Sequence, residues 1–164
     1  MYKIFIACPI SKYLREEEFT NLLFKQFITK VYELCRKYSD NVFLALEREK
    51  YGKARMEDEV CTPLDYKEME ESNLVIAIPE DSMGVAVEIG WASALKKDVI
   101  LLLDHDFSYS PLVKAIGTVV SCDIIDLPVG NKYSMQECGV LNSLEEKIAA
   151  RFHIYDRKGK RTND

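Results

Sequence analysis

Three side chains that could do chemistry lie close together in the sequence: Asp65, Ser82 and Glu88. Glu88 interrupts an apolar run, between Val87 and Ile89, where a charge needs either an exposed position or a function. A carboxylate near the start of a helix gains from the helix dipole, stays ionised and can attack an electrophilic carbon once water is excluded. The alternative interpretation is a first-turn Glu that caps its own helix.

The residues around Glu88 favour a ligand site. Gly84 and Gly90 bracket it, which indicates close approach of backbone or ligand. Ser82 and Gly84 precede a helix, in the kind of turn whose N–H groups and hydroxyl hold a phosphate, although most Ser-x-Gly turns bind nothing. Asp65 is expected to open the helix that ends before the next strand, where an acid is also common for purely structural reasons.

Alternating strands and helices must position these residues. Buried apolar runs predict strands at 3–8, 42–47, 74–79, 99–103 and 119–125. Helical periodicity covers 16–38, 63–71, 85–96 and 143–155. The alternation predicts an α/β fold with a single domain: a doubly wound, flavodoxin-like or Rossmann-like sheet of five parallel strands with helices on both faces. The domain covers residues 1–155, and 156–164 form a flexible charged tail.

Composition narrows the class of partner. A net charge of -5 with interspersed signs gives no basic face for a nucleic acid polymer or an anionic membrane, so a small ligand is expected. With no signal or membrane-spanning segment, we expect a cytoplasmic protein. The 5 cysteines are an odd number without a CxxC pair, and the 2 histidines lack ligand spacing. We therefore expect reduced thiols and no metal site.

Four segments resemble the nucleoside 2-deoxyribosyltransferase superfamily, which includes the nucleoside 5'-monophosphate N-glycosidases. They are GVAVEIGWASALKKDVILLL, IFIACPIS, FLALEREKYG and DYKEMEESNLVIAIP, and together they span residues 3 to 103. The resemblance implies that Glu88 attacks or electrostatically supports the anomeric carbon of a nucleoside sugar, as in glycoside hydrolysis. It implies that Asp65 lies near the base or the sugar and assists protonation of the leaving base. No cofactor is implied.

The choice between nucleoside and nucleotide falls on Ser82. Within the resemblance, the residue six before the nucleophile is typically Asp in the transferases, where it binds the 5'-hydroxyl, and Ser in the monophosphate hydrolases. A hydroxyl would not repel a phosphate dianion as a carboxylate would. The chain also has Pro111 where the transferases carry an Asn, and it lacks their aromatic C-terminus. Against a phosphate, Glu80 and Asp81 flank Ser82 unless their side chains point away.

Ligands bind beyond the carboxyl ends of the strands in a doubly wound sheet, which selects the first two strand-to-helix loops among others. Ser11, Lys12 and Tyr13 are candidate substrate contacts in the first loop, where Lys12 and Arg15 could offset the acidic residues. Solvated surface is the alternative for both cations. Glu47, after the second strand, is a candidate for the base pocket, or else a strand-end residue in water.

Other functions stay open. A transferase that exchanges bases on deoxyribose shares the first half of the reaction, and a nucleotide sensor would bind without cleaving. A cysteine phosphatase built on Cys8 and Arg15 is disfavoured, because six residues separate them instead of five and Pro9 lacks an N–H. A receiver domain lacks its paired acids. Trp91, either core or interface, and the resemblance together predict a homodimer or larger homo-oligomer.

Overall fold

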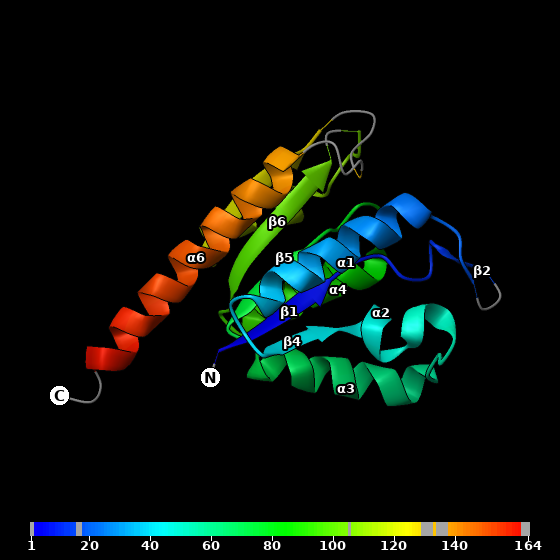
Figure 1. Ribbon diagram of the computed structural model, residues 1–164, viewed down its shortest axis with the longest axis horizontal. Helices are drawn as coiled ribbons and strands as arrows, with labels where there is room; N and C mark the ends of the chain where they lie inside the picture. The colour runs from blue at the N-terminus through cyan, green and yellow to red at the C-terminus, as the bar shows by residue number, and fades with distance from the viewer. Residues whose placement is uncertain (1, 16–17, 105, 129–132, 134–137, 162–164) are drawn as a thin grey trace.

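The fold is seen in a computed structural model that describes residues 2–15, 18–104, 106–128, 133 and 138–161. Five parallel strands form one sheet in the order β4-β1-β5-β6-β7 (Figure 1). They are β1 (Lys3–Ala7), β4 (Asn41–Leu44), β5 (Leu74–Ala77), β6 (Asp98–Asp104) and β7 (Cys122–Leu127). The predicted five-stranded parallel sheet is confirmed. Because the chain winds from β1 first to β4 and then back to β5, the strand order reverses beside β1.

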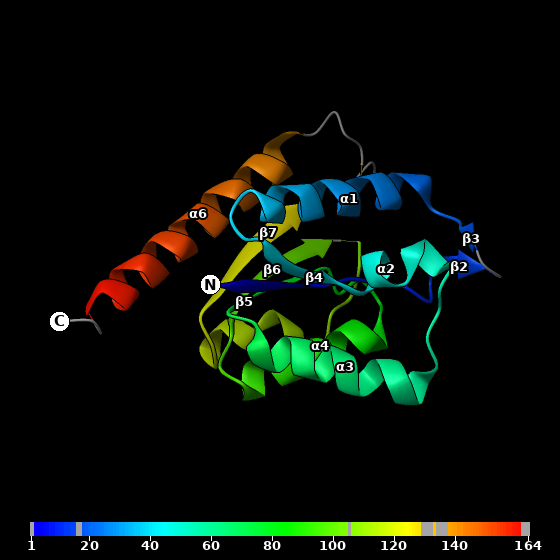
Figure 2. The ribbon, with the colours of Figure 1, turned by 60° about the horizontal axis from the view of Figure 1, so that its bottom comes forward.

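Helices cover both faces of the sheet, as predicted. One face carries α1 (Leu22–Arg36) and α6 (Cys138–Arg161), and the other carries α3 (Asp58–Glu71) and α4 (Met83–Ala94) (Figure 2). Successive side chains of a strand point to opposite faces. Accordingly Ile4 and Ile6 pack in the core under α1 and α6, whereas Phe5 and Ala7 pack under α3 and α4. This double burial explains why the strands are continuous apolar runs.

In the described ranges, a small hairpin, two short helices and two 3-10 turns lie between the main elements. A hairpin of two short antiparallel strands, β2 (Leu14–Arg15) and β3 (Glu18–Phe19), follows β1. The helix α2 (Ala45–Arg48) follows β4 directly, and the 3-10 turn η1 (Lys50–Gly52) comes after it. Between β6 and β7 lie α5 (Pro111–Lys114) and the 3-10 turn η2 (Ile116–Thr118). Several of these elements lie at the carboxyl ends of the strands, where doubly wound sheets bind ligands.

The second strand and the third helix differ from the prediction. β4 ends at Leu44, so Glu47 lies on α2 and not at the end of a strand. The α3 helix begins at Asp58, so Asp65 lies in its middle and does not open it. The helical periodicity predicts a helix only from Pro63, which lies inside α3. The helix instead starts five positions earlier, with two acidic residues in its first turn.

Three other elements also have boundaries that differ from those predicted from the sequence. Asn21 caps α1 by accepting from the Phe24 N–H at 3.0 Å, so the helix starts at Leu22 and not at residue 16. The 3-10 turn delays the start of β7 to Cys122. The last helix begins at Cys138 and continues to Arg161, so residues 156–161 of the expected flexible tail are helical; residues 162–164 lie outside the described part of the chain.

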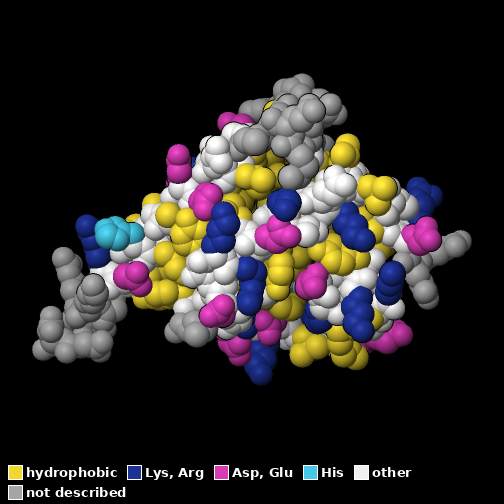
Figure 3. Space-filling model, viewed as in Figure 1, with side chains coloured by type: hydrophobic (Ala, Val, Ile, Leu, Met, Phe, Trp, Pro, Cys, Tyr) yellow, Lys and Arg dark blue, Asp and Glu magenta, His cyan; other side chains and the backbone are white. Residues whose placement is uncertain are grey.

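The surface carries charges of both signs. On the face shown in Figure 3, lysines and arginines alternate with acidic side chains without forming a single-sign field. Within the described ranges, no helix is both long and apolar enough to cross a bilayer.

Candidate active site

A cavity of about 510 Å³ opens at the carboxyl ends of β1 and β5, beside the reversal of strand order. Its volume is typical of small-ligand sites. Residues from the loop after β1, from α3 and from the start of α4 line it: Cys8, Ile10, Ser11, Lys12, Cys61, Asp65, Asp81, Ser82, Met83, Gly84, Val85 and Glu88. Six of the eight residues predicted from the sequence therefore meet in one place.

Glu88 projects from the second turn of α4 and is partly buried. Its removal from water raises the pKa of its carboxyl to about 8, with a further increase from Asp65 and an opposing effect from Arg48. The expectation of a permanently ionised Glu88 is therefore wrong. The helix dipole acts mainly within the first turn, and Glu88 lies beyond it. Near neutral pH this carboxyl is mostly protonated in the ligand-free protein.

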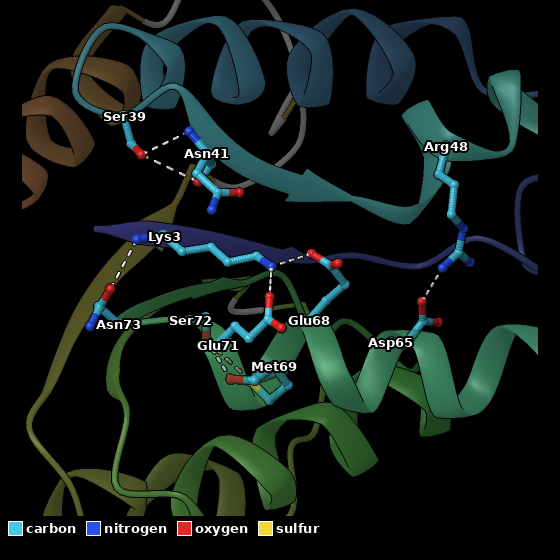
Figure 4. Close-up of polar contacts among 10 residues, drawn as sticks. All are labelled: Lys3, Ser39, Asn41, Arg48, Asp65, Glu68, Met69, Glu71, Ser72 and Asn73. Atoms are coloured by element: carbon cyan, nitrogen blue, oxygen red, sulfur yellow. Dashed lines mark hydrogen bonds and ion pairs between the residues drawn. The ribbon is translucent and has the colours of Figure 1, made fainter. Parts of the chain in front are cut away.

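Asp65 is held by Arg48, a residue that the sequence analysis missed. Arg48 Nη1 donates to Asp65 Oδ1 at 2.5 Å (Figure 4), and Arg48 Nη2 donates to Glu49 Oε1 at 3.0 Å. Burial still raises the pKa of Asp65 above its ordinary value, although the bond from Arg48 acts to lower it. Two carboxyl groups with raised pKa values therefore line the same cavity.

The Ser82 turn starts α4. Ser82 Oγ accepts from the Val85 N–H at 3.4 Å as the N-cap of this 12-residue helix. The helix N-terminus thus faces the cavity beside a hydroxyl, as a phosphate site requires. A Cβ on Gly84 would lie 3.8 Å from Ser82 Oγ, whereas one on Gly90 would meet nothing within 4 Å. The close approach expected at Gly90 is absent among the described residues.

Glu80 and Asp81 do not both face a ligand at Ser82. Glu80 is 4% exposed, has a φ of 41°, and accepts hydrogen bonds from the hydroxyls of Tyr13, at 2.8 Å, and Tyr133. Lys12 Nζ lies 2.9 Å from a Glu80 carboxylate oxygen and 2.6 Å from one of Asp81. Glu80 therefore points into the protein, and Lys12 offsets the charge of Asp81 at the edge of the cavity.

Two candidates do not line the cavity. The Tyr13 hydroxyl is engaged with the buried Glu80 carboxylate. Glu47 is exposed on α2, because α2 replaces the last residues of the predicted strand. Arg15, which was considered beside Lys12, is exposed on β2. Trp91 packs edge-on against Tyr66 of α3 at 5.3 Å between ring centres, partly buried in this chain.

The remaining residues with possible chemistry are the cysteines and the potential metal ligands of the described ranges. Cys8 is buried at the end of β1, and loss of water raises the pKa of its thiol well above the ordinary value, as expected for a small core residue. Cys35, Cys61 and Cys122 are also free thiols. In the described part of the chain, no three His, Cys, Asp or Glu residues cluster in a way that could hold a metal ion.

Several solved structures have the same architecture as this chain. The CMP N-glycosidase BcmB of Clostridium botulinum is 28% identical with a TM-score of 0.60, covering 82% of this chain and 95% of its own. BlsM is 28% identical with a TM-score of 0.68, covering 92% and 93%. A 2-deoxyribosyltransferase from Bacillus psychrosaccharolyticus shares the fold at 21% identity and a TM-score of 0.50, covering 72% and 82%.

No protein-family model and no curated protein matches the chain. The structural neighbours nevertheless support the nucleoside 2-deoxyribosyltransferase-like superfamily as the class of this protein, in agreement with the resemblance of its sequence segments. The N-glycosidase among these neighbours, at 28% identity, supports an enzyme.

Proposed function

We propose that this chain hydrolyses the N-glycosidic bond of a nucleoside 5'-monophosphate and releases the free base. The observation that carries the proposal is the cavity at β1 and β5, which brings Glu88, Asp65 and the Ser82 turn together. A solved neighbour of 28% identity is a CMP N-glycosidase, which supports this reaction class and makes a pyrimidine monophosphate the first substrate to test.

The two carboxyl groups have complementary roles. Ionised Glu88 attacks the anomeric carbon, or supports the oxocarbenium-like transition state, as the bond from that carbon to the base breaks. The electron pair of this bond goes to the base, which takes a proton from Asp65. Water then attacks the sugar carbon, releases Glu88 and returns a proton to the pair. The pair holds one proton near neutral pH, because the pKa of Glu88 is about 8, and the reaction uses the arrangement in which this proton lies on Asp65 and Glu88 is ionised.

The Ser82 turn is the proposed phosphate site. The Ser82 hydroxyl and the N-terminal N–H groups of α4 suit an anion, and Lys12 Nζ lies on the same cavity wall. Glu80 is directed away from this turn, which weakens the main objection to a phosphate there. Ser11 and Gly84 complete the contacts that we assign to the substrate.

Free-base release, followed by chromatography, tests the proposal directly. The panel contains ribo- and deoxyribonucleosides and their 5'-monophosphates, with and without an added acceptor base, and Glu88→Ala is the control. We expect release from a monophosphate without acceptor and none from Glu88→Ala. Base exchange that requires an acceptor would instead identify a deoxyribosyltransferase. Binding of a monophosphate without any release would identify a sensor.

Ser82→Asp tests the phosphate assignment separately. The new carboxylate would lie where the phosphate dianion binds, so kcat/KM for the monophosphate should fall by about a hundredfold or more, and that for the free nucleoside much less. Ser82→Asn keeps an N-cap and adds no charge, so it controls for the helix start. Equal losses on both substrates in Ser82→Asp would contradict a phosphate at this position.

A further inference from the structure

Arg48 connects two elements of the site. It is the last residue of α2, and its guanidinium reaches across to α3, where it bonds to Asp65 (Figure 4). Its other end bonds to Glu49, and its Cζ lies 5.4 Å from the centre of the Phe43 ring. The side chain is 22% exposed, and its buried Nε has no hydrogen-bond partner among the described residues. The guanidinium is therefore fixed in place from several sides.

The charges around Arg48 are mostly acidic. Glu49 follows α2, Asp65 and Glu68 lie on α3, and Glu88 lies on α4; Glu68 acts on Asp65, and Arg48 acts on Glu88. Cys8, just after β1, and Cys61 on α3 also line the cavity. On the other wall, Lys12 is engaged with Glu80 and Asp81. The field of Arg48 therefore acts on both carboxyl groups of the proposed reaction.

We propose that Arg48 is a positioning residue for this reaction: its bond to Asp65 fixes that carboxyl group beside Glu88 on the cavity wall. The inference rests on the proposed function for its catalytic readout. Arg48 does not line the cavity and acts through the two carboxyl groups. Without it, two carboxyl groups removed from water would face each other with less compensation, and both would bind protons more tightly.

The dependence of rate on pH follows from this assignment. The reaction uses the carboxyl pair with one proton, so kcat/KM should fall as pH rises through the pKa of Glu88, about 8, where the pair loses that proton. Arg48 lowers that pKa, so removal of its charge should move the falling limb to higher pH. A purely structural contribution would lower the rate by the same factor at every pH.

The first experiment compares Arg48→Gln, Arg48→Lys and wild type in base release from about pH 5.5 to 9.5. In Arg48→Gln the falling limb should move up by about one pH unit, so that the fraction of maximal activity kept at pH 9 rises roughly fivefold. Arg48→Lys keeps the charge and should shift the limb much less. Lys53→Gln, an exposed charge change in the same loop, should match wild type. An unmoved limb in Arg48→Gln would overturn the inference.

A second readout does not depend on activity. The Glu88 carboxyl carbon can be followed by NMR titration in 13C-labelled protein and assigned by its disappearance in Glu88→Gln. We expect a midpoint near 8 in wild type and a higher one in Arg48→Gln. If wild type releases no base, the proposed function fails while this titration still tests Arg48. An unchanged midpoint would reject the role of Arg48 whatever the activity.

A further variant covers the case in which Arg48→Gln does not fold. Asp65→Asn removes the acidic neighbour and leaves the guanidinium without that partner, so the Glu88 midpoint should fall below 8. A midpoint that stays at or above the wild-type value in Asp65→Asn would show that the Arg48–Asp65 pair does not govern the ionisation of Glu88.

Discussion

Two places along α3 hold similar ion pairs with different consequences, one at its C-terminal end and one in its middle, and Figure 4 shows both. At one end, Lys3 of β1 lies 2.6 Å from Glu68 and 2.8 Å from Glu71. In the middle of the helix, Arg48 of α2 bonds to Asp65. These two places are called the Lys3 end and the Arg48 end below. Both cations come from the β1–β4 edge of the sheet and tie it to the same helix.

Water distinguishes the two ends. The side chains of Glu68 and Glu71 are 31% and 50% exposed, and the bond from Lys3 lowers the pKa of Glu71. Asp65 is 17% exposed, shares its cavity with Glu88, and both carboxyl groups have raised pKa values. The ion pair with access to water thus favours the ionised form of Glu71 and links elements. The ion pair beside a second, partly buried carboxyl group lies in a site that holds a proton near neutral pH.

The largest expected effect is on activity at the Arg48 end. Glu88→Gln removes the nucleophile and keeps the shape of the side chain, so base release should fall by at least about a thousandfold. The assay is the chromatographic release of base from the monophosphate that wild type uses. Glu68→Gln, the same chemical change near the Lys3 end, should stay within about threefold of wild type. Comparable losses of activity in the two variants would show that the Arg48 end and the Lys3 end do not differ in their effect on catalysis.

A smaller effect concerns stability as a function of pH. In the folded protein the pKa of Glu88 is about 8, above its ordinary value of 4.5, so the native state holds this proton more tightly than the unfolded chain. The associated stability is fully present below about pH 4.5 and is lost as pH rises towards 8, amounting to a few kcal/mol at most. Glu88→Gln should remove this loss.

Urea unfolding of both proteins between about pH 5 and 9 measures the difference. Relative to wild type, Glu88→Gln should gain stability steadily as pH rises. A constant difference across this range would mean that Glu88 titrates as it does in the unfolded chain, and the distinction from the Lys3 end would lose its electrostatic basis.

The smallest effect is at the Lys3 end. Lys3→Met keeps the buried stem and removes the bonds to Glu68 and Glu71, so the free energy of unfolding should fall by about 1–2 kcal/mol. The values of kcat and KM should not change, because Lys3 lies at the opposite end of β1 from the cavity. Denaturant unfolding and base release measure the two properties. A change in the pH profile of activity would show that the two ends are coupled.

Much of the fold was predictable, because a sheet buried on both faces gives continuous apolar strands. Glu88, Asp65 and Ser82 were predicted to form the site from their loops and from family resemblance, and the structure brings them together. Arg48 was missed although it lies in a selected loop. The run from Phe43 to Glu47 reads as a strand, whereas the chain turns helical at Ala45, and only this turn directs Arg48 towards α3.

Contacts between distant residues explain the other misses. The direction of the Glu80 side chain depends on a left-handed backbone at a residue that is not glycine, which a sequence does not reveal. The pairing of Lys12 with Asp81 joins residues 69 positions apart. The raised pKa of Glu88 depends on burial and on two neighbours from other elements, none of which local sequence specifies.

The buried Glu80 also affects the entropy of binding. Glu80 lies two positions before Ser82, and its carboxylate accepts hydrogen bonds from two distant tyrosines. Tyr13 is 67 positions away, after β1, and Tyr133 is 53 positions away, between β7 and α6. The three side chains lose their conformational freedom when the protein folds. A ligand that arrives at the Ser82 turn therefore meets a rim that is already ordered. Its affinity is reduced little by the freezing of loops, and its association need not wait for them to close.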